Sequence, residues 1–148
     1  MVIKMRVWIV SIASMMLIAV MMMTPGARAA DRPAGTAAAS SAAKSWLKLI
    51  DQGDYDASFA QACTMFRNSI SAEEWTKRVG AARKMMGALI SRRQKSAAYS
   101  TSLPGAPDGQ YVVLEYDTSF QNKKSAVEGV TSMLDKDGQW RVSGYFIK

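Results

Sequence analysis

The sequence predicts an α+β fold in which three N-terminal helices pack on one face of a four-stranded antiparallel sheet. Apolar residues recur with helical spacing from residue 38 to about residue 87. Beyond that point the chain becomes rich in β-branched and aromatic residues, and turn-forming residues divide it. The apolar residues of these later segments mostly share one parity, as expected when one sheet face is buried. The segments lie near residues 89–100, 110–120, 125–135 and 139–147.

The first 29 residues predict an export signal. Lys4 and Arg6 provide a positive start, and the apolar run 7–23 follows. A Pro-Gly pair then ends the run, and Ala27-Arg28-Ala29 has the small-x-small pattern that signal peptidase cleaves. Cleavage near Ala29 would make the protein periplasmic or secreted. The alternative is an N-terminal membrane anchor, because the run is near the lower limit of roughly 17 residues for a spanning helix.

The charge of the remaining chain argues against nucleic-acid binding. Removing residues 1–29 leaves 16 basic and 12 acidic residues, since Lys4, Arg6 and Arg28 leave the total of 19. The remaining basic residues form no contiguous run longer than a pair, whereas nucleic-acid binders concentrate their charge in a patch. Membrane contact is then expected only through an uncleaved signal.

Two residue types limit the chemistry. The chain has no histidine, which excludes Ser-His-Asp and Cys-His catalysis and histidine-ligated zinc. Cys63 is the single cysteine, so it can form no internal disulfide. Its apolar neighbours favour a small buried hydrophobic residue, and an intermolecular bridge or a reactive thiol is the alternative. We expect no cofactor and no metal.

After a flexible lead-in at residues 30–37, a single domain is expected over residues 38–148. Its first helix ends at Asp51-Gln52-Gly53. Residues 53–70 predict a second helix, with Cys63 on its apolar face. Ser71 caps a third helix, with Glu74 three residues on, and that helix ends near Met86 or Gly87. The expected inward stripe of the first helix is Ala42, Ser45, Trp46, Leu49 and Ile50; that of the second is Tyr55, Phe59, Ala62, Cys63 and Phe66; that of the third is Trp75, Val79 and Ala82.

The last hairpin sets the register of the sheet. Lys136-Asp137-Gly138 suits a three-residue turn with glycine in the left-handed position, which pairs Leu134 with Trp140. Even-numbered side chains should then face the helices. This set is Val112, Leu114, Tyr116, Phe120, Val130, Leu134, Trp140, Val142 and Phe146, and the mixed opposite face holds Tyr111, Glu115, Asp117, Thr131, Arg141 and Tyr145. By analogy alone, the architecture is cystatin-like or NTF2-like.

Four stretches carry a resemblance to a known family. "WLKLIDQGDYDASF", "EEW…R…G" from Glu73 to Gly87, "LPGAPDGQYVVLEY" and "DGQWRVSGYFIK" are similar, in order and spacing, to the uncharacterised bacterial family called domain of unknown function 4019. The resemblance covers about residues 42 to 148. One departure is Met85-Met86-Gly87, where such proteins often carry Pro-Leu-Gly. The resemblance implies no activity.

A loop and a single glutamate are candidates for a site. The loop at residues 103–110 has two prolines and two glycines, and it reads either as a stiff connection or as the rim of a pocket beside an exposed Tyr111. Glu128 falls on the buried face, near Phe146 and close to Tyr116 or Thr118. A carboxylate among aromatic rings can act as a general acid or base, and the alternative is a strand-end residue that reaches water or a basic partner.

Three arginines complete the candidates for ligand binding. Arg83, Arg92 and Arg141 could bind an anion or stack on an aromatic ring. Arg141 is expected beside Tyr145 on the wet face, where a surface pair with Glu115 or Asp117 is the alternative.

Two functional classes remain open. The first is a binding or interaction module that takes an unknown small molecule or envelope protein, either on the wet face of the sheet or in an apolar pocket between helices and sheet. The second is an NTF2-like enzyme that uses Glu128. Because histidine and metal-ligand clusters are missing, the sequence favours the binding module. The oligomeric state does not follow from the sequence.

Overall fold

The computed structural model describes the backbone of residues 26–148 and the side chains of residues 32–148. The signal predicted for residues 1–29 falls largely outside this range. Residues 33–148 form one compact unit. Its elements, in chain order, are α2 (Gly26–Gln52), α3 (Tyr55–Ala60), α4 (Thr64–Ser69), α5 (Ala72–Met86), β1 (Leu89–Ser100), β2 (Tyr111–Phe120), β3 (Ala126–Leu134) and β4 (Trp140–Ile147).

Helix α2 begins earlier than the sequence predicts. It includes residues 30–37, which were expected to form a flexible lead-in. Alanine-rich sequence favours a helix here, and Gly35 lets the helix approach the Trp140 ring, which an added Cβ would meet at 3.2 Å. The buried stripe is also rotated from the expected one, since Ala42 and Leu49 are only half-buried and Ser45 is exposed. The buried residues are Ala39, Ala43, Trp46, Leu47 and Ile50.

The second predicted helix is two short helices. The chain breaks after α3, and Cys63 becomes the N-cap of α4, where its Sγ accepts a hydrogen bond from the Phe66 amide at 3.3 Å. The Cys63 amide donates to the Val142 carbonyl at 2.9 Å. A continuous helix would use that amide internally, so bonding to β4 requires the break. Cys63 and Ala62 are buried as expected.

Helix α5 follows the prediction closely. The Ser71 side chain accepts from the Glu74 amide at 3.1 Å, and the helix ends at Met86. Gly87 follows with φ 74°, a conformation that glycine adopts without a Cβ penalty. Trp75 and Val79 are buried as expected. Arg83, one turn further on, is also buried, and the position of its charge is described below.

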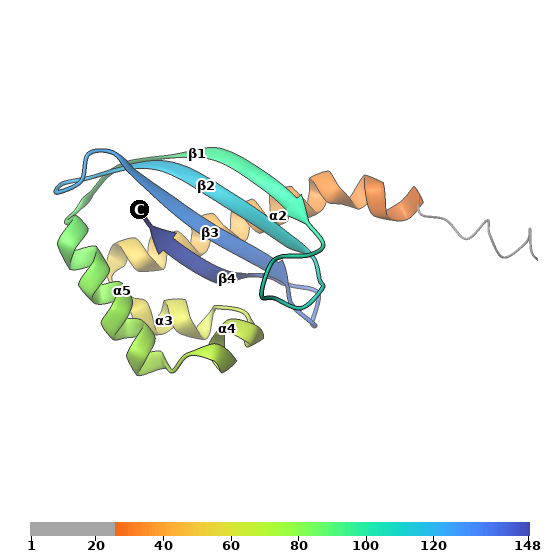
Figure 1. Cartoon of the computed structure of the whole chain (residues 1–148), viewed down its shortest axis with the longest axis horizontal. Coiled ribbons are helices and arrows are strands. Elements are labelled where there is room, and N and C mark those ends of the chain that lie inside the picture. The colour runs from red at the N-terminus through yellow and green to blue at the C-terminus, as the bar shows by residue number, and fades with distance from the viewer. Residues whose placement is uncertain (1–25) are drawn as a thin grey trace, which may run out of the picture. The chain divides into compact units, whose positions relative to one another are not determined.

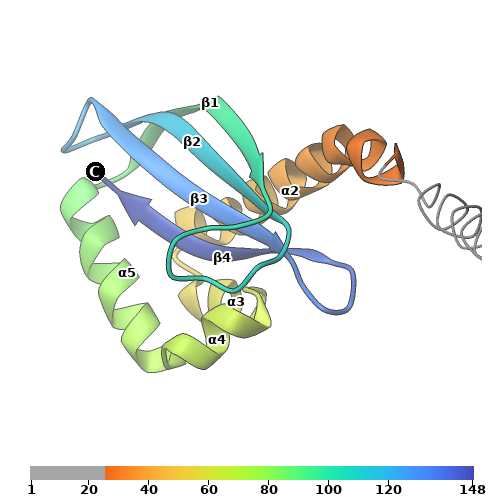
Figure 2. The ribbon, with the colours of Figure 1, turned by 45° about the vertical axis from the view of Figure 1, so that its right-hand side comes forward.

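The four strands form an antiparallel sheet in the order β1-β2-β3-β4. The turn before β4 has Gly138 at φ 79°, and Leu134 pairs with Trp140, both as predicted. Helix α2 runs across one face of the sheet, while α3, α4 and α5 lie beside β4 (Figures 1 and 2). The predicted packing of all helices on one face is therefore too simple. The shared core contains Trp46, Trp75, Val79, Val112, Leu114, Tyr116, Val130 and Val142.

A β-bulge reverses the expected faces at the end of β4. The pairing shifts by one residue between Ser132–Val142 and Thr131–Gly144. Such an insertion exchanges the faces of every later side chain. Tyr145 therefore turns inward, with its ring 5.4 Å from that of Trp46, and Phe146 lies on the outer face and is 46% exposed. The predicted faces of these two residues are wrong.

Candidate functional site

Glu128 is the centre of a buried polar cluster. Its side chain is 0% exposed, and it lies on the helical face of β3 opposite Tyr116, as the register predicts. Three side chains donate hydrogen bonds to its carboxylate. They are Arg92 Nε at 2.5 Å, Tyr145 OH at 2.6 Å and Thr118 Oγ1 at 2.8 Å. The aromatic neighbour is thus Tyr145 and not Phe146, as a consequence of the bulge.

Two arginines and a second carboxylate extend this cluster. Arg92, on β1, also donates to both oxygens of Asp51, at 2.7 and 2.9 Å. Arg83, on α5, donates to Asp51 at 3.1 Å, and its Nη1 lies 3.7 Å from Glu128 Oε1. Four charges therefore alternate in sign between elements that are far apart in sequence. Asp51 was interpreted from the sequence only as part of a helix stop, so its role was missed.

Burial and hydrogen bonding shift the pKa values of Arg92 and Tyr145 in this cluster. Burial opposes the charge on Arg92, but hydrogen bonds to Asp51 and Glu128 outweigh it and raise the pKa of that guanidinium. Burial and the negative charge of Glu128 both raise the pKa of Tyr145, so its phenol remains protonated near neutral pH. The cluster is organised as a set of ion pairs around the fully buried Glu128 carboxylate. Both of its oxygens accept hydrogen bonds, whereas the buried Arg83 Nη1 makes no hydrogen bond to the described residues.

Tyr111 and Arg141 lie away from this cluster. Tyr111 is buried, not exposed, because the loop at residues 101–110 folds over it; its hydroxyl donates to the Pro107 carbonyl at 2.6 Å. Arg141 pairs with Asp137 at 2.7 Å and Asp135 at 3.3 Å. That pairing differs from the Glu115 or Asp117 partner expected from the sequence. Hydrogen bonds from Arg141 lower the pKa of Asp137 to about 2.

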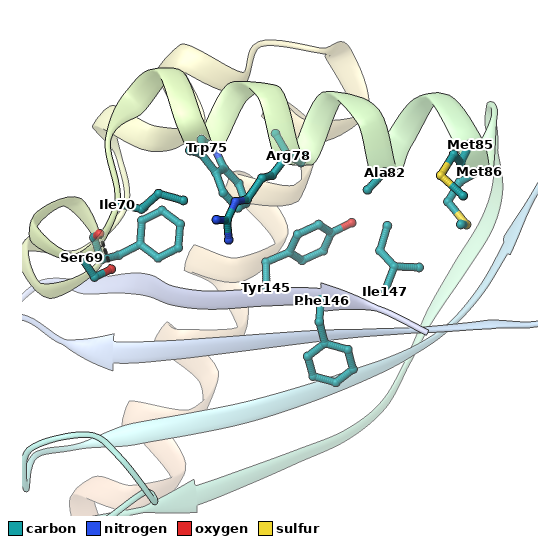
Figure 3. Close-up of a pocket in the computed structure, with 12 residues that line it drawn as sticks. Ser69, Ile70, Trp75, Arg78, Ala82, Met85, Met86, Tyr145, Phe146 and Ile147 are labelled. Carbon is teal, nitrogen blue, oxygen red and sulfur yellow. Dashed lines mark hydrogen bonds between the residues drawn. The ribbon is translucent and has the colours of Figure 1, made fainter.

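An apolar groove lies between α5 and β4, and we call it the α5–β4 groove (Figure 3). It has a volume of about 580 Å³. Trp75, Ala82 and Met86 point into it from α5, and Tyr145 and Ile147 point toward the helix from β4, whereas the Phe146 ring points away. It is lined by Phe66, Ser69, Ile70, Trp75, Arg78, Val79, Ala82, Met85, Met86, Tyr145, Phe146 and Ile147.

Arg78 is the charged residue of the groove. Its side chain extends from α5 toward β4 (Figure 3), and its Nε donates to Glu74 at 2.5 Å. Side-chain exposures of 69% for Arg78 and 42% for Glu74 place this pair in water, where such pairs contribute little. The guanidinium can therefore exchange Glu74 for another anion at small cost. Arg78 is not among the site residues predicted from the sequence, although the sequence places it next to Val79 on an amphipathic helix.

Two further cavities are more polar. One lies beside Asp51, Arg83 and Lys84, with a volume of about 630 Å³. The other, of about 640 Å³, is bounded by α4, the turn before β4 and loop residues 107–109. The loop at residues 101–110 therefore covers Tyr111, and its residues 107–109 border this second cavity. Within residues 26–148 no helix has both the length and the apolar character needed to cross a bilayer. The same residues contain no group of three potential metal ligands.

Comparison with known proteins gives one match. The family model described as "Protein of unknown function (DUF4019)" matches residues 42–145, which include the whole Glu128 cluster and every groove residue except Phe146 and Ile147. No curated protein and no solved structure matches the chain.

Proposed function

We propose a function from the site itself, since the chain belongs to the DUF4019 family, whose description assigns no activity. The proposal is that the protein is a binding module that holds an apolar ligand in the α5–β4 groove. The observation that carries it is the groove, which leaves apolar side chains of α4, α5 and β4 in contact with solvent. Its volume of about 580 Å³ is in the range of small-molecule and peptide sites.

The exposure of apolar groups at the groove supports binding. Met85, at its rim, is 71% exposed. Large apolar side chains that remain in water lower their free energy when a ligand covers them, by roughly 25 cal/mol per Å² of apolar area. Apolar walls with one charged residue, Arg78, are the usual composition of a site in which a few polar groups orient an apolar ligand.

The alternative, an enzyme based on Glu128, has less support. A general acid or base must come within hydrogen-bond reach of a substrate atom. Both Glu128 oxygens already accept hydrogen bonds from the protein, and the side chain is 0% exposed. Tyr145 is the one member of the cluster that also lines the groove, and it donates its proton inward to Glu128. The cluster then positions Tyr145 as part of the groove wall.

Two finer assignments belong to the same proposal. The four-stranded meander with α2 across one face supports a cystatin-like or NTF2-like architecture by analogy. The export pattern of residues 4–29 supports a periplasmic or secreted location, in which the ligand is a small molecule or a segment of an envelope protein.

A fluorescent probe tests the proposed function. The probe is 1-anilinonaphthalene-8-sulfonate, which has apolar rings for the groove and a sulfonate for Arg78. We expect the parent protein to bind it with enhanced fluorescence. Ala82→Trp should weaken binding at least tenfold, because an indole would fill the groove that Ala82 lines.

Ala81→Trp is the matched control. Ala81 is exposed on the same helix and does not line the groove, so its variant should bind like the parent. Near-UV circular dichroism must show native packing in all three proteins, because partly folded states also bind this dye. Equal binding by both tryptophan variants, or no binding by the native parent protein, would contradict the proposed function.

A further inference from the structure

We infer that the occupant of the α5–β4 groove is an extended peptide that carries a carboxylate and pairs with the free edge of β4 as a fifth strand. This inference rests on the proposed function of the groove and names its ligand class. It is carried by the main chain of β4, by the apolar walls of the groove and by the charge of Arg78.

The main chain of β4 presents unpaired groups to the groove. The Lys148 amide donates to the Val127 carbonyl at 2.9 Å, and the Val127 amide donates to Lys148 at 2.8 Å. Main-chain groups alternate in direction along an antiparallel strand, so those of Tyr145 and Ile147 point away from β3. Among residues 26–148, no segment outside the sheet provides them with a main-chain hydrogen bond. An edge of this kind is a template for another strand.

The same edge already binds main chain at one point. The Val142 carbonyl accepts the Cys63 amide at 2.9 Å, where α4 begins. This contact uses the beginning of β4 and leaves the part beyond the bulge open. Tyr145 and Ile147 belong to that open part and also line the groove. The unpaired main chain and the apolar cavity are therefore at the same place.

The groove walls suit a strand with apolar side chains. In an added strand, main-chain bonds provide affinity and alternate side chains enter pockets that provide specificity. The wall opposite β4 is α5, whose Val79, Ala82 and Met86 line the groove. Figure 3 shows Ala82 and Met86 on this wall. A strand between a helix and a sheet edge would direct alternate side chains against these residues.

Charge points to a carboxylate on the peptide. Of the described residues that line the groove, Arg78 alone is charged. Either an Asp or Glu side chain or a C-terminal carboxylate supplies the required group. A small apolar molecule would fill the groove but leave the main chain of Tyr145 and Ile147 without partners, which favours a peptide.

The test uses synthetic pentapeptides and the whole protein. The set has an acetylated N-terminus, Val, Ile, Leu or Phe at four positions and Asp at each position in turn; each is made as the free acid and as the C-terminal amide. We expect members to displace a fluorescein-labelled member of the set, which fluorescence polarisation measures. Loss of binding in every amide would assign the carboxylate to the C-terminus, and dependence on the Asp position would assign it to a side chain.

Two signatures distinguish strand pairing from simple apolar contact. N-methylation at alternate residues of the best peptide should weaken binding at least tenfold in one set and have little effect in the other. In hydrogen-exchange NMR, the Tyr145 and Ile147 amides should exchange at least tenfold more slowly with peptide bound. Arg78→Glu should weaken binding at least tenfold, and Lys77→Glu, on the exposed side of α5, should leave it within twofold.

Several outcomes would overturn the inference. Equal binding by both N-methylated sets, or unprotected Tyr145 and Ile147 amides, excludes strand pairing. Slow exchange of these amides in a peptide-free dimer shows that the occupant is a second copy. Binding of the dye without binding of any peptide overturns the inference and leaves the proposed function intact. If the dye also fails to bind, both the inference and the proposed function are wrong.

Discussion

At the scale of single residues, the most consequential position is Glu128. A buried carboxylate is costly unless its charge is paired and its oxygens are hydrogen-bonded. Glu128 meets both conditions through Arg92, Thr118 and Tyr145. Its contribution to the stability of the folded state is therefore greatest when every partner is present, since removing one member leaves an uncompensated buried charge.

Glu128→Gln should destabilise the protein by about 3 kcal/mol, the lower end of the cost of breaking a buried pair, because Asp51 still neutralises Arg92. Urea unfolding at pH 7 measures the change. Glu115→Gln on the outer face of β2 is the control, and it should change stability by no more than about 0.5 kcal/mol. Equal unfolding midpoints for the two variants would show that the cluster does not stabilise the fold.

At the scale of elements, the features that the sequence predicts correctly are those that depend on residues close together in the chain. The alternation of apolar residues and the turn at Gly138 depend on neighbours in the chain, and the strands agree with them. The bulge in β4 depends on distant residues instead. It turns Tyr145 toward Trp46 and Glu128, and its local sign in the sequence is Gly144, an isolated glycine within the strand. The break before α4 has a similar cause, since Cys63 bonds to Val142.

The candidate site shows the same difference between what depends on local sequence and what depends on distant residues. Glu128, Arg83, Arg92 and Tyr145 are each candidates from the sequence. Glu128 is one because it falls on the buried face, the arginines because they can bind an anion or stack on an aromatic ring, and Tyr145 because it is expected beside Arg141. Their grouping was not predictable, because it requires the end of α2, the last turn of α5 and two strands to meet around Asp51 and Glu128. The α5–β4 groove was likewise foreseen only as a pocket between helices and sheet.

The bulge also explains a close approach between two strands. With Phe146 on the outer face, its ring lies over Gly129, and a Cβ at that position would be 2.0 Å from Phe146 Cε1. Gly129→Ala should therefore cost about 1 kcal/mol, because the half-exposed ring can swing outward instead of forcing the backbone to move. Thermal unfolding measures the change.

Gly144→Ala is the matched control for that substitution. Its nearest contact would be Thr131 Cβ at an ordinary 3.7 Å, so it should cost less than Gly129→Ala. Adding Phe146→Ala to Gly129→Ala should remove the steric part of the cost. Equal effects of the two glycine substitutions would contradict the position of Phe146, and with it the bulge.

At the scale of the whole domain, two of the sets of polar contacts that join helices to the sheet bear on the groove. The Asp51–Arg83–Arg92–Glu128 cluster links α2 and α5 to β1 and β3. At α4, the Thr64 amide donates to Asp135 at 2.9 Å and Cys63 bonds to β4. Helix α5 lies between these attachments in the chain. The wall of the α5–β4 groove is thus fixed at its ends, which leaves the space between it and β4 for a ligand.

Cys63 can report whether these two attachments open together. Its side chain is buried, and burial raises the pKa of its thiol, so a disulfide reagent should label it only when the domain opens. If the domain unfolds as one cooperative unit, Glu128→Gln should speed labelling on the order of a hundred-fold, the equivalent of about 3 kcal/mol. Glu115→Gln should label like the parent. An unchanged rate in a Glu128→Gln protein that urea shows to be destabilised would mean that α4 opens independently of the Glu128 cluster.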